Sequence, residues 1–323
     1  DSLNTRIYYL DSLKVLAIFA VVLLHAASTP LYTMSPDTVV FGYANLLDSF
    51  ARFCVPVFFM ASGAAILSRD YDTFDFYRKR LYRIIPAFAF WGAVYLGYRI
   101  FVLGEDISPL KAVLAVLSGH IYYHLWFLYV IVILYILSPF IRRLVVSIGR
   151  EEGFVLLFVW VFISVLLPHA EALTGQKIGF SYRELGSYCG YFMLGFYLSR
   201  IRFSRPLVAL TLYILSSVFI YLLTADFSLQ KGEFVSLFYE YSSPLVLIQS
   251  VAMFLLFSSI QNSKIHSYAA HLSGLVFGVY LVHPLILEHS KFIGDLSLKG
   301  IFVFASSLLA VKIMCMIGLK KVL

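Results

Sequence analysis

The sequence consists largely of apolar stretches of about twenty residues, which recur from one end of the 323-residue chain to the other. A stretch of that length spans the hydrocarbon core of a bilayer as an α-helix. Hydrophobic residues make up 61% of the chain and charged residues 13%, and a soluble domain of this size would still have to expose much of that apolar surface to water. The sequence therefore predicts an all-α, polytopic membrane protein and excludes a soluble protein with one anchor.

Ten membrane-spanning helices are predicted, all in one transmembrane domain that covers residues 1–323. Their expected ranges are 8–29, 44–67, 82–103, 124–146, 153–169, 185–200, 206–224, 241–259, 272–290 and 300–319. Because ten is an even number, both termini are expected on the same side of the membrane. The segment 104–123 is amphipathic, and we expect it to form a short helix on the membrane surface.

Lysine and arginine are distributed unequally between the two sets of connecting loops. Loops on the N-terminal side carry 15 of these residues: Arg6, Arg69, Arg78, Lys79, Arg80, Arg83, Arg142, Arg143, Arg150, Arg200, Arg202, Arg205, Lys264, Lys320 and Lys321. The opposite loops carry six: Lys111, Lys177, Arg183, Lys231, Lys291 and Lys299. The positive-inside rule therefore predicts cytoplasmic termini. It also accounts for the net charge of +7 without a nucleic-acid partner.

The first predicted span carries three polar side chains that a simple membrane anchor does not need. Lys14 and His25 are eleven residues apart, which places them on one face of a helix, about 16 Å apart along its axis. Asp11 precedes Lys14 by nearly one turn on the same side. Ionisable residues inside the membrane usually mark a functional site. The alternatives are that Lys14 extends toward the headgroups and that His25 is a satisfied histidine of a packed bundle.

The second span and the loop after it add further candidates. Arg52 is expected near the outer end of the second span, level with His25, or else as an interfacial anchor. Ser62 lies beside Gly63, and this pair indicates either a ligand contact or close helix packing. The cations of the segment 76–86 are dense enough to bind a polyphosphate, although lipid headgroups are an alternative partner. They are Arg78, Lys79, Arg80 and Arg83.

Two later segments combine histidine with aromatic residues. His124 and Trp126 open the fourth span, where an aromatic belt at the membrane interface is the simpler interpretation. Tyr280 and His283 lie on the ninth span, and Pro284 is expected to kink it and free backbone carbonyls. A metal site built from His283, Glu288 and His289 is disfavoured by their angles around a helix, so no metal is predicted.

Five segments together resemble the membrane acyltransferase-3 family in order and content. They are "YYLDSLKVLAIFAVVLLHA", "RFCVPVFFMASG", "YRKRLYRIIP", "HLWFLYVIVILYILSPFI" and "GVYLVHPLI". The resemblance covers essentially the whole chain and is strongest to the branch that O-acetylates bacterial surface polysaccharides. The most specific motif is a basic residue followed, after ten others, by a histidine.

The resemblance implies a function for the polar residues. It implies about ten helices around a central acyl-coenzyme A pore, in the bacterial inner membrane. Acetyl-coenzyme A would donate its acetyl group from the cytoplasm to a hydroxyl of an exopolysaccharide or lipid-linked glycan on the far side, a modification associated with biofilms. His25 looks like the essential histidine, Lys14 the basic residue before it, and Arg78, Arg80 and Arg83 the coenzyme-binding cluster. Many members carry arginine where this chain has Lys14, so the forked contact of a guanidinium is lost here.

The geometry of the first span agrees with this chemistry. His25 is suited to act as the general base on a glycan hydroxyl, and either Arg52 or a backbone N–H would stabilise the oxyanion. A transporter of a glycan precursor or small anion is the alternative function, and a structural membrane subunit is another. A transporter would share polar residues and carboxylates along several helices, whereas Asp11, Asp48 and Glu288 are expected near helix ends.

Overall fold

The computed structural model describes residues 7–175, 183–260 and 263–323. Every regular element in these ranges is a helix, which confirms the all-α prediction. The α-helices are α1 (Tyr8–Thr33), α2 (Val39–Ala51), α3 (Cys54–Leu67), α4 (Thr73–Phe101), α5 (Pro109–Ser118), α6 (Trp126–Ser147), α7 (Arg150–Val161), α8 (Leu167–Thr174), α9 (Arg183–Leu198), α10 (Pro206–Lys231), α11 (Pro244–Ser259), α12 (Ser263–Ser273), α13 (Val276–Glu288) and α14 (Leu296–Met316). The short elements are the π-helix η1 (Phe162–Leu166) and the 3₁₀-helices η2 (Leu237–Tyr239) and η3 (Leu319–Val322).

Within the described ranges, eight segments are long and apolar enough to cross a membrane. They are Tyr8–Thr33, Val39–Leu67, Thr73–Phe101, Trp126–Ser147, Arg150–Thr174, Pro206–Lys231, Leu237–Ser259 and Leu296–Met316. Helices α12 and α13 form a ninth segment if they are counted as one span, although they are bent by 62° relative to each other. The remaining predicted span, 185–200, corresponds to α9, which has 16 residues. The polytopic all-α prediction is therefore confirmed.

Two predicted spans are broken inside the bundle. The second is divided at Arg52 and Phe53, where α2 ends and α3 begins. Arg52 therefore lies in the middle of the Val39–Leu67 segment, and its expected position near the outer end is wrong. The ninth predicted span is bent just before α13, whereas Pro284 lies inside α13 without ending it.

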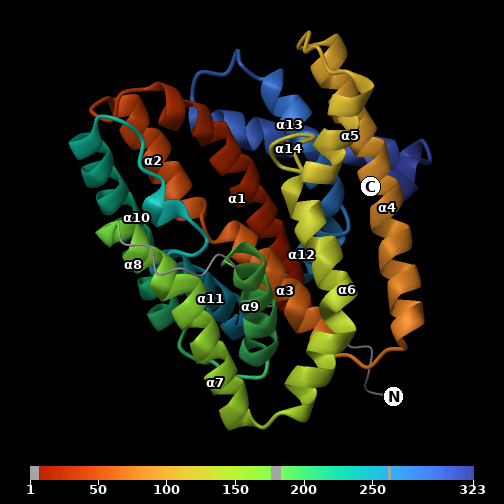
Figure 1. Ribbon diagram of the computed structural model, residues 1–323, viewed down its shortest axis with the longest axis vertical. Coiled ribbons are helices and arrows are strands. Elements are labelled where there is room, and N and C mark those ends of the chain that lie inside the picture. The colour runs from red at the N-terminus through yellow and green to blue at the C-terminus, as the bar shows by residue number, and fades with distance from the viewer. Residues whose placement is uncertain (1–6, 176–182, 261–262) are drawn as a thin grey trace.

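The helices form a bundle in which α1 occupies a central position (Figure 1). Figure 1 shows α10 along one edge and α4 along the other, with α3, α6 and α9 between them. The arginine-rich connections α3–α4 and α6–α7 lie at its lower end, and the connection between α1 and α2 lies at the upper end. These three connections are divided between the two ends as the sequence predicts, whereas Figure 1 shows the N-terminus at the lower end and the C-terminus in the upper half, beside α4. Arg6 and Lys177, which entered that comparison, lie outside the described residues.

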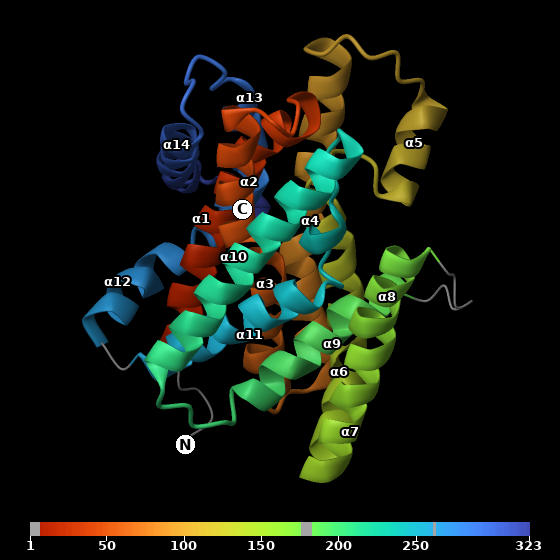
Figure 2. The same cartoon turned by 90° about the vertical axis from the view of Figure 1, so that its left-hand side faces the viewer.

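Two elements depart from the direction of the main bundle. Figure 2 shows α14 end-on, whereas most of the other helices run up or obliquely across the picture, and α5 stands apart from the rest. The short helix α5 begins at Ser108, whose hydroxyl accepts a hydrogen bond from the Lys111 N–H, and ends at Gly119 with a φ of 77°. It has no buried residue, and it confirms the short helix predicted within 104–123. The chain ends beside α4, where the Trp91 indole donates to the Val322 carbonyl at 2.8 Å.

Helices α3 and α9 pack with their backbones in direct contact. A Cβ atom built on Gly63 would lie 1.7 Å from the Phe192 carbonyl oxygen, and one on Gly195 would lie 1.9 Å from the Met60 carbonyl oxygen. No side chain fits at either position, so both residues have to be glycine for the helices to approach this closely. Gly63 therefore serves helix packing, the alternative that the sequence left open for it.

Candidate functional site

A cavity of about 250 Å³ lies between α1, α3, α4, α6 and α13, and we call it the basic cavity. It brings together residues that lie far apart in the sequence, and eight of the thirteen predicted site residues line it. These eight are Lys14, His25, Ser62, Arg80, Arg83, His124, Trp126 and Tyr280. A ninth, His283, does not line the cavity but lies within hydrogen-bond distance of His25. The structure thus gathers most of the predicted site in one place.

The two polar residues of α1 mark different levels of this cavity. Helix α1 is continuous from Tyr8 to Thr33, so the helical rise separates Lys14 from His25 by about 16 Å. Both side chains line the basic cavity, as their shared helix face predicts. Asp11 lies in the first turn of α1, is half-buried and does not line the cavity.

His25 is hydrogen-bonded to a second histidine. Its Nδ1 atom lies 2.8 Å from Nε2 of His283, and the two rings are nearly parallel, with an interplanar angle of 2°. Nδ1 of His283 lies 2.8 Å from the Tyr280 carbonyl and 3.1 Å from the Val279 carbonyl. Because carbonyl oxygens only accept hydrogen bonds, Nδ1 of His283 carries a proton. With both rings neutral, Nε2 of His283 accepts from Nδ1 of His25, which leaves Nε2 of His25 as a free acceptor.

The proline after His283 explains why a carbonyl is available to hold it. In an uninterrupted helix the Tyr280 carbonyl would accept from the N–H four residues later, but that residue is Pro284, which has none. The Nδ1–H of His283 takes the vacant position. The sequence predicted freed carbonyls at this point, and the structure shows that His283 itself uses one.

His124 is the third histidine of the cluster. Its ring centroid lies 5.6 Å from that of His283 and 5.2 Å from that of Tyr280. Only 2% of the residue is exposed, and neither ring nitrogen has a hydrogen-bond partner among the described residues. The Tyr280 hydroxyl donates to the His124 backbone carbonyl at 2.5 Å and so fixes the segment. A buried, unpartnered imidazole on a cavity wall is placed to meet a polar atom of a ligand.

The basic cluster divides into two faces of α4. Arg80 and Arg83, three residues apart, line the cavity, and their guanidinium groups lie 5.5 Å from the Tyr135 ring and 5.8 Å from the Phe277 ring, respectively. Arg78 is 76% exposed and pairs with Asp75 at 2.9 Å. Lys79 is exposed and does not line the cavity either. The cavity thus has two arginines and Lys14 at one end.

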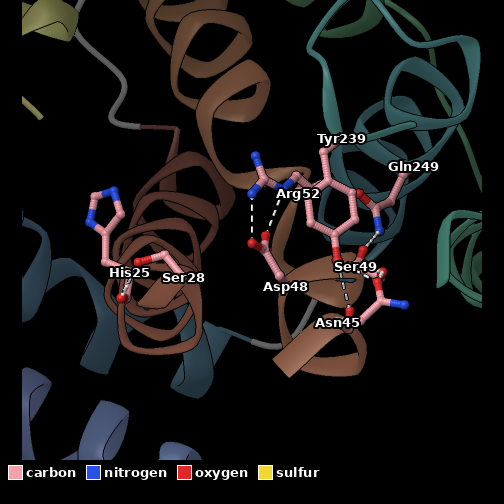
Figure 3. A network of polar contacts seen from close by, with 8 residues as sticks. All are labelled: His25, Ser28, Asn45, Asp48, Ser49, Arg52, Tyr239 and Gln249. Carbon is pink, nitrogen blue, oxygen red and sulfur yellow. Dashed lines mark hydrogen bonds and ion pairs between the residues drawn. The ribbon is translucent and has the colours of Figure 1, made fainter. Parts of the chain in front are cut away.

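Arg52 belongs to a separate buried network (Figure 3). Its guanidinium contacts both carboxylate oxygens of Asp48 at 2.6 Å and lies over the Tyr239 ring at 4.3 Å. Beside this pair, Tyr239, Ser49 and Asn45 are hydrogen-bonded to one another, as Figure 3 shows. Arg52 does not line the basic cavity.

The sequence interpretation missed the Asp48 pairing. Asp48 is 1% exposed and lies in the last turn of α2, near a helix end as expected, but that helix end falls in the middle of the Val39–Leu67 segment. The available signal was the spacing of polar residues three to four apart, which puts them on one face of a helix. Those residues are Asn45, Asp48, Ser49 and Arg52.

The metal set that the sequence disfavoured is dispersed. His283 faces His25, whereas His289 contacts the Leu285 carbonyl and Glu288 pairs with Lys291 at 3.2 Å. No group of three or more His, Cys, Asp or Glu side chains in the part of the chain that the structure describes is arranged to hold a metal ion.

A second and larger cavity, of about 1100 Å³, adjoins the first, and we call it the aromatic cavity. Its aromatic lining consists of Tyr122, Tyr123, Trp126, Tyr129, Tyr188 and Tyr241. Trp126 and Tyr241 line both cavities and so form their common wall. The ring of Tyr123 meets the ring of His25 edge-to-face at 5.1 Å. His25 therefore lies at the junction of the two cavities. Of this aromatic lining, only Trp126 was predicted from the sequence.

Comparison with known families agrees with the resemblance noted in the sequence. The family model for the acyltransferase-3 domain, described as an acyltransferase domain, matches residues 7–318. No curated protein and no solved structure matches the chain.

Proposed function

Since the chain belongs to the acyltransferase-3 family over residues 7–318, we propose that it is an acetyl-coenzyme A-dependent O-acetyltransferase of the bacterial inner membrane. The acceptor is a hydroxyl of an extracytoplasmic polysaccharide or of its lipid-linked precursor. Both termini are proposed to be cytoplasmic, as the distribution of basic loops indicates. The proposal rests on one observation: a single cavity has cations at one end and, at the other, His25, whose Nε2 is left as an acceptor by its hydrogen bond to His283.

The basic cavity suits coenzyme A as a donor. Lys14, Arg80 and Arg83 provide positive charge for the phosphates of the nucleotide head. Its volume of about 250 Å³ is small for a ligand site, so it suits a thin pantetheine arm better than a bulky group. The distance of about 16 Å from Lys14 to His25 lets the arm carry the thioester to the histidine cluster. Ser62, on the wall of the same cavity, is proposed to contact the arm.

His25 is proposed as the catalytic base. Its free Nε2 takes the proton of the acceptor hydroxyl while the hydroxyl oxygen attacks the acyl carbon. The new C–O bond forms, the C–S bond breaks, and the proton passes from His25 to the departing coenzyme A sulfur. His283 does not touch the substrate; it holds His25 in the tautomer that this step requires. Direct transfer is favoured because the sequence shows no obvious second nucleophile.

The developing oxyanion needs a donor near the acyl carbon. His124 lines the cavity with an unpartnered ring, so its N–H is available for this purpose. The donors that the sequence suggested, Arg52 or a backbone N–H, stay candidates, although the Arg52 guanidinium contacts both oxygens of Asp48.

One experiment tests the enzyme against the transporter. Purified protein in detergent is incubated with acetyl-coenzyme A and extracted membrane glycans, and free coenzyme A thiol and acetylated glycan are both measured. The proposal predicts equal amounts of the two products, which His25→Ala abolishes. A transporter leaves acetyl-coenzyme A intact, so no release of thiol above a protein-free control would overturn the proposed function.

A further inference from the structure

A two-substrate transfer needs room for an acceptor next to the donor. The basic cavity, at about 250 Å³, falls below the usual range of roughly 300–1,000 Å³ for ligand sites and has no space for a second substrate beside the pantetheine arm. The aromatic cavity, at about 1100 Å³, is large enough for more than one ring. It reaches the reaction centre, because Trp126 and Tyr241 are common to both cavities and Tyr123 contacts His25.

The charges on the aromatic cavity disfavour a phosphorylated ligand. Its only arginine or lysine among the described residues is Arg99, which is paired with Glu105 through three hydrogen bonds of 2.6–3.1 Å. This guanidinium holds the pKa of Glu105 below its usual value, so the carboxylate stays charged. Glu240 adds a second carboxylate to the lining. The cavity therefore favours a neutral or hydroxylated ligand, in contrast to the basic cavity.

The aromatic lining offers flat faces of the kind that sugar rings use. Tyr188 lies against Trp126 with centroids 5.4 Å apart at 35°, and Tyr241 lies 6.3 Å from Trp126 at 31°. The negative face of an aromatic ring attracts polarised C–H groups, which a pyranose presents on its flat side. The edge of the pyranose ring bears hydroxyls, which can donate hydrogen bonds to a carboxylate such as that of Glu240.

We propose that the aromatic cavity is the acceptor site, which binds a pyranose unit of the glycan against Trp126, Tyr188 and Tyr241. The bound sugar presents one hydroxyl past Tyr123 to Nε2 of His25. This inference rests on the proposed function, and it adds the location and chemical class of the second substrate. Because the two substrates occupy different cavities, a substitution in one cavity should leave the affinity for the substrate of the other cavity unchanged.

The test measures transfer of labelled acetyl groups to extracted membrane glycans. At saturating acetyl-coenzyme A, Tyr188→Ala should raise the acceptor KM by about tenfold, with the donor KM unchanged. Tyr188→Phe keeps the ring and should behave as wild type. Because Tyr188 also packs on Phe59, at 4.9 Å, Glu240→Gln at an exposed position provides a second variant, which should raise the acceptor KM without a loss of folded protein. Phe158→Ala, an exposed aromatic on α7 that lines neither cavity, is the matched control.

The outcomes separate the two proposals. If wild-type protein neither binds nor turns over acetyl-coenzyme A, the proposed function fails. If turnover occurs but Tyr188→Ala and Glu240→Gln both leave the acceptor KM at the value of Phe158→Ala, the acceptor site is wrong while the enzyme stands. Competition adds an independent readout: methyl pyranosides should raise the apparent acceptor KM without changing the donor KM. A panel without any such competitor would overturn the assignment to a sugar.

Discussion

Nδ1 of His25 and Nε2 of His283 lie 2.8 Å apart, although the two residues are separated by 258 positions in the chain. Since Pro284 frees the carbonyl that holds His283, the proton arrangement of the cluster follows from backbone geometry. The catalytic role proposed for His25 depends on this arrangement, and it leads to the first two predictions.

Replacing His25 should remove the general base and leave the donor site. We expect His25→Gln to reduce acetyl transfer by roughly 10²–10⁴-fold, because a glutamine amide cannot take a proton. Binding of coenzyme A should persist, since the cations of the basic cavity lie at its other end. Near-normal acetylation of the native glycan by the Gln variant would make His25 a packing residue.

His283→Leu should lower kcat by roughly 10–100-fold with little change in the acetyl-coenzyme A KM, as expected for loss of a residue that orients another. His283→Gln should recover part of this loss, because its amide oxygen can accept from Nδ1 of His25.

A second variant tests the carbonyl that holds His283. Pro284→Ala supplies an N–H that competes for the Tyr280 carbonyl, and ¹⁵N spectra of the histidines should then show a mixture of tautomers. Equal activities of the Leu and Gln variants would contradict the positioning role.

The two faces of the basic cluster should differ in their effect on the donor. Arg80→Ala combined with Arg83→Ala is expected to raise the acetyl-coenzyme A KM steeply, with turnover at saturation less affected. Arg78→Ala combined with Lys79→Ala removes the same charge from the face outside the cavity and should leave the KM close to wild type. Added salt should reproduce part of the first effect. If both double variants change the KM alike, the cluster sets the membrane orientation or binds lipid headgroups and does not bind the donor.

The Asp48–Arg52 pair provides a way to separate stability from catalysis. Removing only one partner, as in Asp48→Asn or Arg52→Met, should destabilise the protein by roughly 3–5 kcal/mol, because it leaves a buried charge without compensation. The double variant Asp48→Leu/Arg52→Met should recover much of that loss in a thermal unfolding measurement. If the double variant is stable and active, Arg52 is not the oxyanion donor, which leaves His124 or a backbone N–H. If it is stable but inactive, Arg52 takes that role.

Labelling in intact cells tests the predicted orientation. In a variant without native cysteines, Asp75→Cys should resist a membrane-impermeant maleimide until the cells are opened, because the arginine-rich end is expected in the cytoplasm. Glu233→Cys, exposed in the segment after α10, should react at once. The reverse pattern would overturn the orientation and the direction of transfer.

The part of the site that lies on one helix could be predicted from the sequence. Helical spacing alone aligned Lys14 with His25, and the density of cations indicated the mouth of the basic cavity. The contact between His25 and His283 could not be predicted, since helical spacing gives the relation of residues within a helix but not between helices. The same limit hid the aromatic cavity, which combines α6 and α9 with the segment around Tyr241. The central position of Asp48 in the Val39–Leu67 segment could not be predicted either, because a continuous apolar pattern does not reveal the break between α2 and α3.

The glycine contacts between α3 and α9 have a mechanical consequence. Gly63 and Gly195 let two backbones touch, which leaves no layer of side chains to shift between them. Helix α3 carries Ser62 on the wall of the basic cavity, and α9 carries Tyr188 on the wall of the aromatic cavity. Helices α3 and α9 therefore form one rigid unit, and neither cavity can widen by a movement of only one of these two helices. For a donor or an acceptor to enter, its cavity has to widen on the side that α3 and α9 do not form. The helices outside this rigid unit therefore control the entry of both substrates.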